Sequence, residues 1–221
     1  MPYGEHDAVV TLFTEQLGTV AALARGARSV RRRGSACFEP MHTLDVTLRE
    51  RSAQGLLAVV SSRIAVPRMH LLGELARMQA AGSALRWVRK AAPARTAEPL
   101  LWAEIVALLD ALDASCLSTT PAVLLATAGL RVLRHLGYGL NLSACVSCGR
   151  ACAPGRPAHV DAPRGGLVCR RCGGAGFLLS GDARARLAAA AAGAGVLASE
   201  DARAALDLVD LALLAHANVK R

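Results

Sequence analysis

Aromatic side chains are scarce in this sequence, at 3% of the residues, although 53% of the residues are hydrophobic. Long apolar runs are missing too, because Glu104 and Asp110 interrupt the closest approach to the roughly 18 residues of a membrane-spanning helix. Residues 1–7 show neither the basic nor the apolar region of a signal peptide. We therefore expect no membrane span and no Sec-type secretion. A chain of 221 residues is long enough for one large domain or two small ones.

Lysine is nearly absent, and acidic residues are outnumbered. Only Lys90 and Lys220 are lysines, yet 26 basic residues against 17 acidic ones give a formal net charge of +9. A chain this basic attracts polyanions, and arginine suits phosphate because its planar fork donates two hydrogen bonds at once. The excess is concentrated in particular segments, which favours a binding surface over charge that serves only solubility.

Motifs of common enzyme classes are also missing. The sequence contains no P-loop, no GxSxG and no HExxH motif. Its carboxylates are scattered, and Asp110 and Asp113 have the spacing of the solvent-facing side of a helix. We therefore predict that the protein is not an enzyme.

The first 66 residues have the patterns of short β-strands. β-branched residues or polar–apolar alternation mark four segments, at 8–14, 19–24, 42–48 and 55–60. Short strands with at most one helical insert suggest a small barrel.

After Pro67 the hydrophobic period becomes that of helices. The predicted helices are 69–90, 98–116, 121–136, 182–193 and 199–216. Residues 142–175 are expected to be rich in loops. The predicted fold class is therefore α+β, with a strand-rich domain at 1–66 and a helical domain at 67–221 that contains a metal-binding segment at 143–175.

Four of the seven cysteines form two CxxC pairs within that segment. Cys145 and Cys148 make the first pair, and Cys169 and Cys172 make the second. This separation fits one tetrahedral zinc with four thiolates at about 2.3 Å. Disulfides, an iron–sulfur cluster or a loop without metal are the alternatives. A closed four-sulfur site leaves no position for water, so the predicted cofactor is one structural Zn²⁺.

The densest run of positive charge is residues 25–34, with five arginines and no acid. Each arginine that neutralises a phosphate releases a counterion, so the run favours salt-dependent nucleic-acid binding; a solvated loop is the alternative. Because few aromatic side chains are present to stack on bases, we expect the protein to contact the nucleic-acid backbone and to distinguish poorly between bases. The predicted DNA-binding residues are Arg25, Arg28, Arg31, Arg32 and Arg33. A second candidate patch consists of Arg150, Arg156, Arg164, Arg170 and Arg171.

Three stretches together resemble the RecO family of bacterial recombination mediators. The first is YGEHDAVVTLFT at residues 3–14, followed by Leu17-Gly18. The second is LGYGLNL at residues 136–142, which leads into the first CxxC pair, and the third is GGLVC at residues 165–169. The resemblance covers nearly the whole chain.

This resemblance implies a small OB-fold β-barrel joined to a helical domain with a zinc-binding insert. Members bind single- and double-stranded DNA, anneal complementary strands, and help load RecA onto DNA covered by single-strand DNA-binding protein. The implied partners are DNA, RecR and the acidic C-terminal tail of single-strand DNA-binding protein, in the bacterial cytoplasm near the nucleoid. The helix at 121–136 is similar to the one that receives the acidic tail, which makes Arg131 and Arg134 candidates to pair with it.

One departure from the family concerns the start of the barrel. Family members have a further stretch before Tyr-Gly-Glu-x-Asp that forms the first strand, whereas Met1 here lies inside that strand. Either the start lies upstream, or the barrel lacks its first strand and leaves an exposed edge. The second case gives the alternative function, a protein-interaction scaffold for RecR and the acidic tail with impaired DNA binding.

Overall fold

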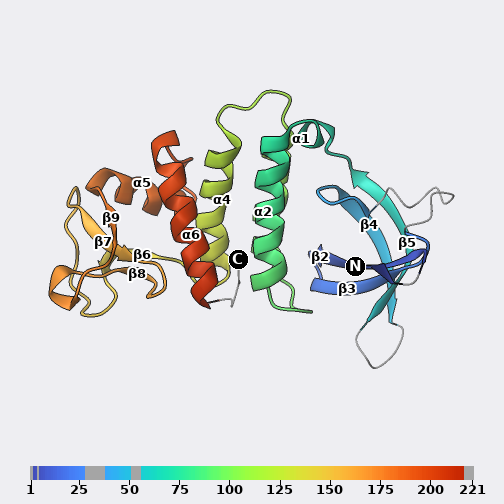
Figure 1. Ribbon diagram of the computed structural model, residues 1–221, viewed down its shortest axis with the longest axis horizontal. Helices are drawn as coiled ribbons and strands as arrows, with labels where there is room; N and C mark the ends of the chain where they lie inside the picture. Colours follow the sequence, from blue (N-terminus) through green and yellow to red (C-terminus); the bar gives the residue numbers. More distant parts are fainter. Residues whose placement is uncertain (1, 4, 28–37, 51–55, 217–221) are drawn as a thin grey trace.

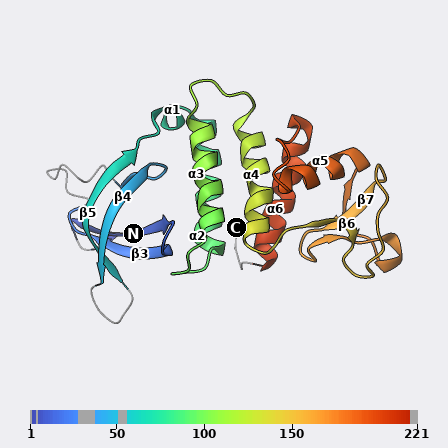
Figure 2. The same ribbon diagram turned by 180° about the vertical axis from the view of Figure 1, so that it is seen from behind.

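A computed structural model describes residues 2–3, 5–27, 38–50 and 56–216. Three parts follow one another along its longest axis (Figure 1): a sheet formed by the N-terminal strands, a helical bundle, and a smaller sheet at the opposite end. The same order is seen from behind in Figure 2. Both β parts therefore flank the helices and lie far from each other.

The first part, the N-terminal sheet, has five strands in the order β1-β2-β3-β5-β4. They are β1 (Pro2–Tyr3), β2 (Asp7–Thr14), β3 (Gly18–Ala24), β4 (Thr43–Glu50) and β5 (Leu57–Val66). All pairs are antiparallel except β3 with β5. Gly18 opens β3 with a φ of 62°, and a Cβ there would lie 1.9 Å from the carbonyl oxygen of Thr96. The four strands predicted from the sequence are confirmed.

The predicted closure of this sheet into a barrel is not found within the described residues. β1 pairs with β2 only, and β4 pairs with β5 only, so both remain edge strands. In the described part of the chain, the sheet is open.

The helices α1 to α4 come next, and α5 and α6 complete the bundle after the second sheet. Their bounds are α1 (Met69–Leu72), α2 (Leu75–Ala91), α3 (Pro99–Asp113), α4 (Pro121–His135), α5 (Gly181–Ala191) and α6 (Ala202–His216), with a 3-10 turn η3 (Ser199–Asp201) before α6. The expected single helix at 69–90 is wrong, because Glu74 is extended and separates α1 from α2. None of the helices in the described ranges combines the length and the apolar character needed to cross a bilayer.

Helix α4 lies at the centre of the bundle and contacts α2, α3, α5 and α6. Its N-terminus is capped by Thr120, whose hydroxyl accepts a bond from the Val123 amide. Gly129 lets the helices approach closely, because a Cβ at this position would lie 3.0 Å from the Trp87 ring. The Trp87 indole in turn donates to the Asp210 carboxylate at 3.1 Å.

The third part spans residues 141–179 and is called the cysteine module here. Its sheet has the order β6-β8-β7-β9, with a 3-10 turn η2 before the last strand. The bounds are β6 (Asn141–Cys145), β7 (Ala158–Asp161), β8 (Gly166–Leu167), η2 (Arg170–Cys172) and β9 (Phe177–Leu179). The expectation of a loop-rich segment missed this sheet, because strands of two to five residues are too short to show a hydrophobic period.

A buried arginine joins the N-terminal sheet to the bundle. Arg68 is fully buried and donates to Asp110 at 3.0 and 2.6 Å, to the Met41 carbonyl and to the Thr43 hydroxyl. Asp113 accepts the Leu71 amide at 2.8 Å. The two carboxylates predicted on the solvent-facing side of the helix therefore also hold the junction between the parts; Asp110 is exposed, as predicted, and Asp113 is half-buried.

Candidate metal centre and basic surfaces

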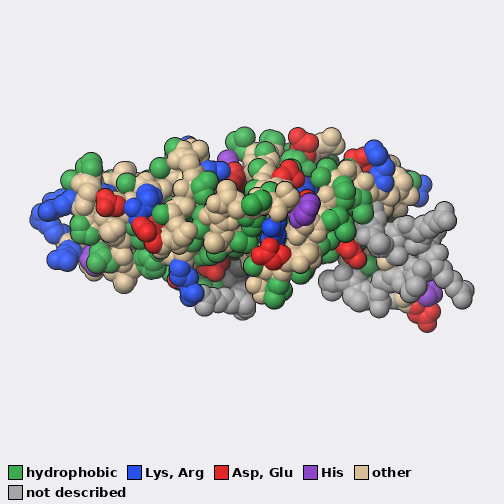
Figure 3. All heavy atoms as spheres, turned by 90° about the horizontal axis from the view of Figure 1, so that it is seen from above, with side chains coloured by type: hydrophobic (Ala, Val, Ile, Leu, Met, Phe, Trp, Pro, Cys, Tyr) green, Lys and Arg blue, Asp and Glu red, His purple; other side chains and the backbone are tan. Residues whose placement is uncertain are grey.

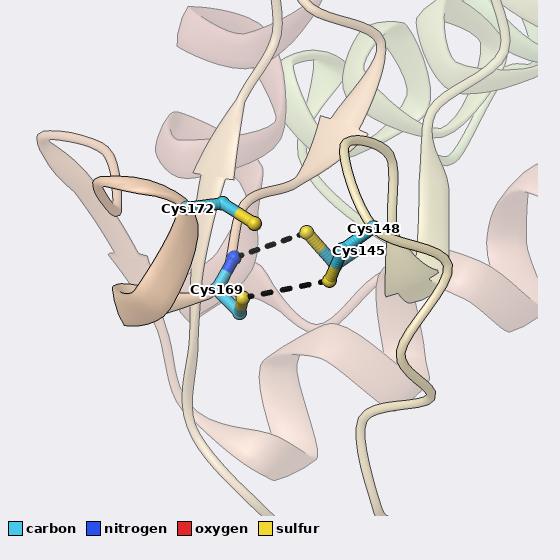
Figure 4. A group of neighbouring side chains, drawn as sticks. All are labelled: Cys145, Cys148, Cys169 and Cys172. Carbon is cyan, nitrogen blue, oxygen red and sulfur yellow. Dashed lines mark hydrogen bonds between the residues drawn. The ribbon is translucent and has the colours of Figure 1, made fainter.

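Four cysteine sulfurs meet in the cysteine module (Figure 4). Cys145 is the last residue of β6, and Cys148 lies in the turn that follows it. Cys169 precedes η2, and Cys172 ends it. The parallel pairing of β6 with β8 brings the two CxxC turns side by side, although twenty residues separate them in the chain.

The backbone of each CxxC turn folds back on itself. The amide of Gly149 donates to the Cys145 carbonyl at 2.8 Å, and the amide of Gly174 donates to the Cys169 carbonyl at 3.1 Å. Gly149 has a φ of 71°, a left-handed conformation that favours glycine. The glycines after each pair thus allow the turn that aims two sulfurs at one point.

The distances between the sulfurs fit a four-coordinate metal. All four lie within 4.8 Å of one another, and the sulfurs of Cys148 and Cys169 are 3.8 Å apart. Sulfurs at about 2.3 Å from a tetrahedral zinc would be separated by about 3.8 Å. The donor set is soft and closed, as in structural zinc sites, so the residues present are compatible with a metal.

Hydrogen bonds inside the cluster already favour a thiolate at one position. The Cys169 amide donates to the Cys145 sulfur at 3.4 Å and, against the effect of burial, lowers the pKa of Cys145 to about 5. The pKa of Cys172 is raised to about 12, because hydrogen bonds with Cys169 and then Cys148 favour its protonated form. A divalent cation bound here would displace the remaining thiol protons.

A second buried arginine anchors the cysteine module to helix α5. The guanidinium of Arg184 donates to the carbonyl oxygens of Leu142, Cys152 and Ala153 at 3.1, 3.3 and 2.5 Å. Its residue is only 5% exposed. The sequence analysis missed Arg184, since one arginine in an alanine-rich helix gives no signal that it is buried.

Exposed arginines surround the metal centre on the outer end of the molecule. Figure 3 shows basic side chains gathered at this end. The residues are Arg150, Arg156, Arg164, Arg170 and Arg171, all of them exposed. The module contains one acidic residue, Asp161, whose carboxylate accepts the Arg164 amide at 3.2 Å. The second basic patch expected from the sequence therefore occupies one continuous module.

The first predicted DNA-binding run is described only in part. Arg25 is exposed directly after β3. The other predicted residues, Arg28, Arg31, Arg32 and Arg33, lie outside the described residues. Their role in DNA binding stays a prediction.

The two arginines expected to receive an acidic tail lie on the same helix, α4, but differ in surroundings. Arg131 is half-buried and donates to the carbonyls of Ala190 and Gly195 at 3.0 and 2.8 Å, with Glu104 3.6 Å away. Arg134 is exposed and makes one long bond, 3.5 Å, to the Ala191 carbonyl. Arg131 is thus engaged within the fold, whereas Arg134 is more available to a partner.

The chain matches two family models in succession. Residues 1–67 match the model described as Recombination protein O N terminal, and residues 72–221 match Recombination protein O C terminal. The junction between them contains Arg68, the residue that joins the N-terminal sheet to the bundle.

Several curated relatives are similar over most of this chain. The DNA repair protein RecO of Anaeromyxobacter sp. (strain K) is 40% identical over 170 residues, which are 77% of this chain and 65% of that protein. The RecO of Geobacter sulfurreducens is 34% identical over 82% of this chain and 72% of its own length. The RecO of Myxococcus xanthus is 33% identical over 77% of this chain and 68% of its own. With both family models matched in order, the chain belongs to the RecO family.

Proposed function

We propose that this chain is a non-enzymatic DNA-binding and strand-annealing mediator of recombinational DNA repair. The observation that carries the proposal is the ordered match of both RecO family models to residues 1–67 and 72–221. In this role it would act with RecR and help load RecA onto DNA covered by single-strand DNA-binding protein. The proposal transfers this role from relatives named DNA repair protein RecO. This chain matches 65% of the length of the Anaeromyxobacter relatives.

The N-terminal sheet supports DNA binding through its topology and its charge. Its order, β1-β2-β3-β5-β4, is compatible with the partly open five-stranded barrel of an OB-fold. The arginine run 25–33 leaves the end of β3 and would contact phosphates. Phe13 packs on Trp102, with ring centroids 5.6 Å apart, and is not available to stack on bases. Affinity would therefore come from the sugar–phosphate backbone and depend steeply on salt.

The metal centre would serve structure rather than chemistry. Cys145, Cys148, Cys169 and Cys172 would hold one zinc ion. The bound ion would supply a cross-link between the two CxxC turns and, with four sulfur ligands, no position for a reacting water. The chain's own contribution is to hold the sulfurs together through the β6–β8 pairing and the bonds of Arg184.

The surface of α4 near Arg134 would receive the acidic tail of single-strand DNA-binding protein. Arg134 is exposed, so it can form an ion pair without breaking a shorter bond. Arg131 would first have to leave Glu104 and two carbonyl oxygens. Within this proposal Arg134 is therefore the principal contact and Arg131 holds the neighbouring loop.

Fluorescence anisotropy with labelled single-stranded DNA over a salt series tests the proposed function. We expect binding that weakens steeply with salt, and weaker binding after replacement of Arg31, Arg32 and Arg33 by alanine. The control replaces three exposed arginines of the bundle, Arg86, Arg89 and Arg203, by alanine. This variant loses the same charge.

Millimolar affinity at low salt, or no salt slope, would contradict DNA binding. If the chain then still binds RecR and the acidic tail, the scaffold function applies instead. Equal affinity of the two triple variants would remove the arginine run from the proposed site and leave the family assignment unaffected.

A further inference from the structure

A groove of about 580 Å³ lies beside the metal centre. Cys145 and Cys169 form part of its wall, and its other lining is largely small or apolar, with Leu178 exposed at its edge. Three arginines line it as well: Arg150, Arg156 and Arg170. The groove therefore combines an apolar floor with several positive charges.

The three groove arginines come from three separate segments. Arg150 follows the first CxxC turn, Arg156 precedes β7, and Arg170 is the first residue of η2. Each is exposed, and within the described ranges none of the three side chains has a carboxylate or hydrogen-bond partner. By contrast, Arg68, Arg77 and Arg186 elsewhere in the fold each pair with an acid. The groove thus gathers guanidinium groups that the fold itself does not use.

We propose that this groove binds the sugar–phosphate backbone of a nucleic-acid strand. The unpaired guanidinium groups would each take a phosphate oxygen, and the apolar floor would lie against the sugars. The proposal rests on the proposed function and deepens it, because it assigns a second DNA contact outside the N-terminal sheet. The groove would not bind the bases by stacking, because none of the residues that line it is a large aromatic.

The extent of the positive charge favours a polymer over a short acidic peptide. Arg164 and Arg171 lie outside the groove but on the same module, so the charge continues beyond the concave part. An acidic peptide end would fill the groove and leave these two residues unused. A nucleic-acid strand presents a phosphate at every step and can follow the whole surface.

Charge compensation at the metal is the competing explanation of these arginines. Four thiolates around a divalent ion carry a net charge of about −2, and nearby guanidinium groups would offset it. That account predicts that arginine substitutions weaken metal retention. The groove proposal predicts that metal is retained and DNA affinity falls.

The groove lies far from the N-terminal sheet, so the two proposed DNA contacts would be at separate places on the molecule. The cysteine module and the N-terminal sheet lie at opposite ends of the long axis, separated by the helical bundle (Figure 1). Two backbone contacts at this separation could hold two strands, or two parts of one strand, at the same time. Strand annealing should therefore depend on the groove more strongly than binding of one strand does.

The test compares two triple variants of the full chain that lose the same charge. Arg150, Arg156 and Arg170 are replaced by glutamine in the first, and Arg86, Arg89 and Arg203 in the control. Zinc content and circular dichroism are measured for both, so that a loss of the fold or of the metal is recognised. Anisotropy with labelled oligothymidylate over a salt series and annealing of complementary strands follow.

We expect the groove variant to bind about tenfold more weakly at low salt, with a salt slope less steep by about 2, since each phosphate contact on a single strand contributes about 0.7. Annealing should fall further than binding. Equal affinity and annealing of the two variants, while the unmodified chain binds DNA, would overturn the groove and leave the proposed function standing. Failure of the unmodified chain to bind DNA would contradict the proposed function itself.

Two further measurements keep the groove testable if the triple variant loses metal. The single variant Arg156→Gln changes an exposed turn residue that is not next to a cysteine, and it should still reduce the salt slope. A photo-crosslinking side chain at position 178, at the edge of the groove, should capture labelled DNA, whereas one at position 100, exposed on α3, should not. Absence of captured DNA at position 178 would show that the groove does not hold nucleic acid. The same conclusion would follow if the glutamine variants bound a labelled acidic peptide more weakly but bound DNA as the unmodified chain does.

Discussion

The two sheets at the ends of the molecule are both small, but they are stabilised in different ways. In the N-terminal sheet, a separate apolar cluster has Val20, Ala22 and Leu57 as its buried members among the described residues. In the cysteine module, buried residues join the main core of the bundle; they include Leu142, Val160, Leu167 and Leu179. The N-terminal sheet thus has the less continuous core, although it has the longer strands.

This difference shows how a small β part compensates for a limited core. Small domains bury too little apolar surface to be stable without further constraints. The cysteine module has four convergent sulfurs and the carbonyl-bound Arg184. The N-terminal sheet has a buried arginine at its junction with the bundle and the packing of Phe13 on Trp102. The four sulfurs are a constraint within the module itself, whereas Arg184, Arg68 and the pair of aromatic rings are contacts with the bundle.

The largest expected effect is on the metal centre. Cys145→Ser removes the sulfur of the most buried of the four cysteines and should abolish stable zinc binding, with a loss on the order of 10 kcal/mol of metal-binding free energy. Because structural thiolate sites contribute folding energy directly, the cysteine module should unfold. Metal analysis should find about one zinc per unmodified chain and none in the variant, and hydrogen exchange should show fast exchange in residues 141–179.

Cys152→Ser is the matched control, because Cys152 lies in the same module but outside the four-sulfur cluster. It should keep its zinc and its protection from exchange. Amides of the N-terminal sheet should stay protected in both variants. Loss of protection in β2 and β3 of Cys145→Ser would show instead that the two ends of the molecule unfold together.

A smaller effect is expected when the cysteine module is detached from α5. Arg184→Met keeps the apolar stem but leaves the carbonyls of Leu142, Cys152 and Ala153 without their donor. The unfolding free energy should fall by about 3 kcal/mol, because buried acceptors lose charge-assisted bonds. Urea unfolding measures the change.

Arg203→Met provides the comparison for Arg184→Met, because Arg203 is exposed and pairs only with Asp207 one turn along α6. Its unfolding free energy should change by less than about 0.5 kcal/mol. Similar losses in the two variants would mean that the contacts of Arg184 do not matter for stability.

Much of the fold follows from the sequence where patterns are long. The strands at 8–14 and 42–48 and the helix at 121–136 match β2, β4 and α4 closely, since each has enough residues to show its period. The sheet of the cysteine module has strands of five residues or fewer and gave no such signal. Hydrophobic periodicity predicts a helix or a strand only when the element is long enough to show several periods of the pattern.

The candidate site divides in the same manner. Spacing alone predicted which four cysteines come together, because two CxxC turns need no knowledge of the surrounding fold. The burial of Arg68 and Arg184 could not be predicted, since their partners are mostly backbone carbonyls and a carboxylate distant in the chain. Asp110 is exposed, as predicted, but its bond to Arg68, 42 positions away in the chain, gave no signal in the sequence.

The smallest of these effects concerns the junction of the N-terminal sheet. Asp110→Ala leaves the guanidinium of Arg68, whose side chain is 1% exposed, without its carboxylate. The Asp110 side chain is 55% exposed, so water replaces part of the lost interaction, and we expect the unfolding free energy to fall by about 2 kcal/mol rather than the 3–5 kcal/mol of a fully buried pair.

The control Asp45→Ala breaks a pair with Arg63 whose two side chains are mostly exposed, and it should lower the unfolding free energy by less than about 1 kcal/mol. If urea unfolding and hydrogen exchange show that Asp110→Ala loosens β4 and α3 while zinc content is unchanged, then the N-terminal sheet depends on this contact with the bundle, whereas the metal centre does not. Equal losses in the two variants would instead assign the stability of the junction to apolar packing such as Phe13 on Trp102.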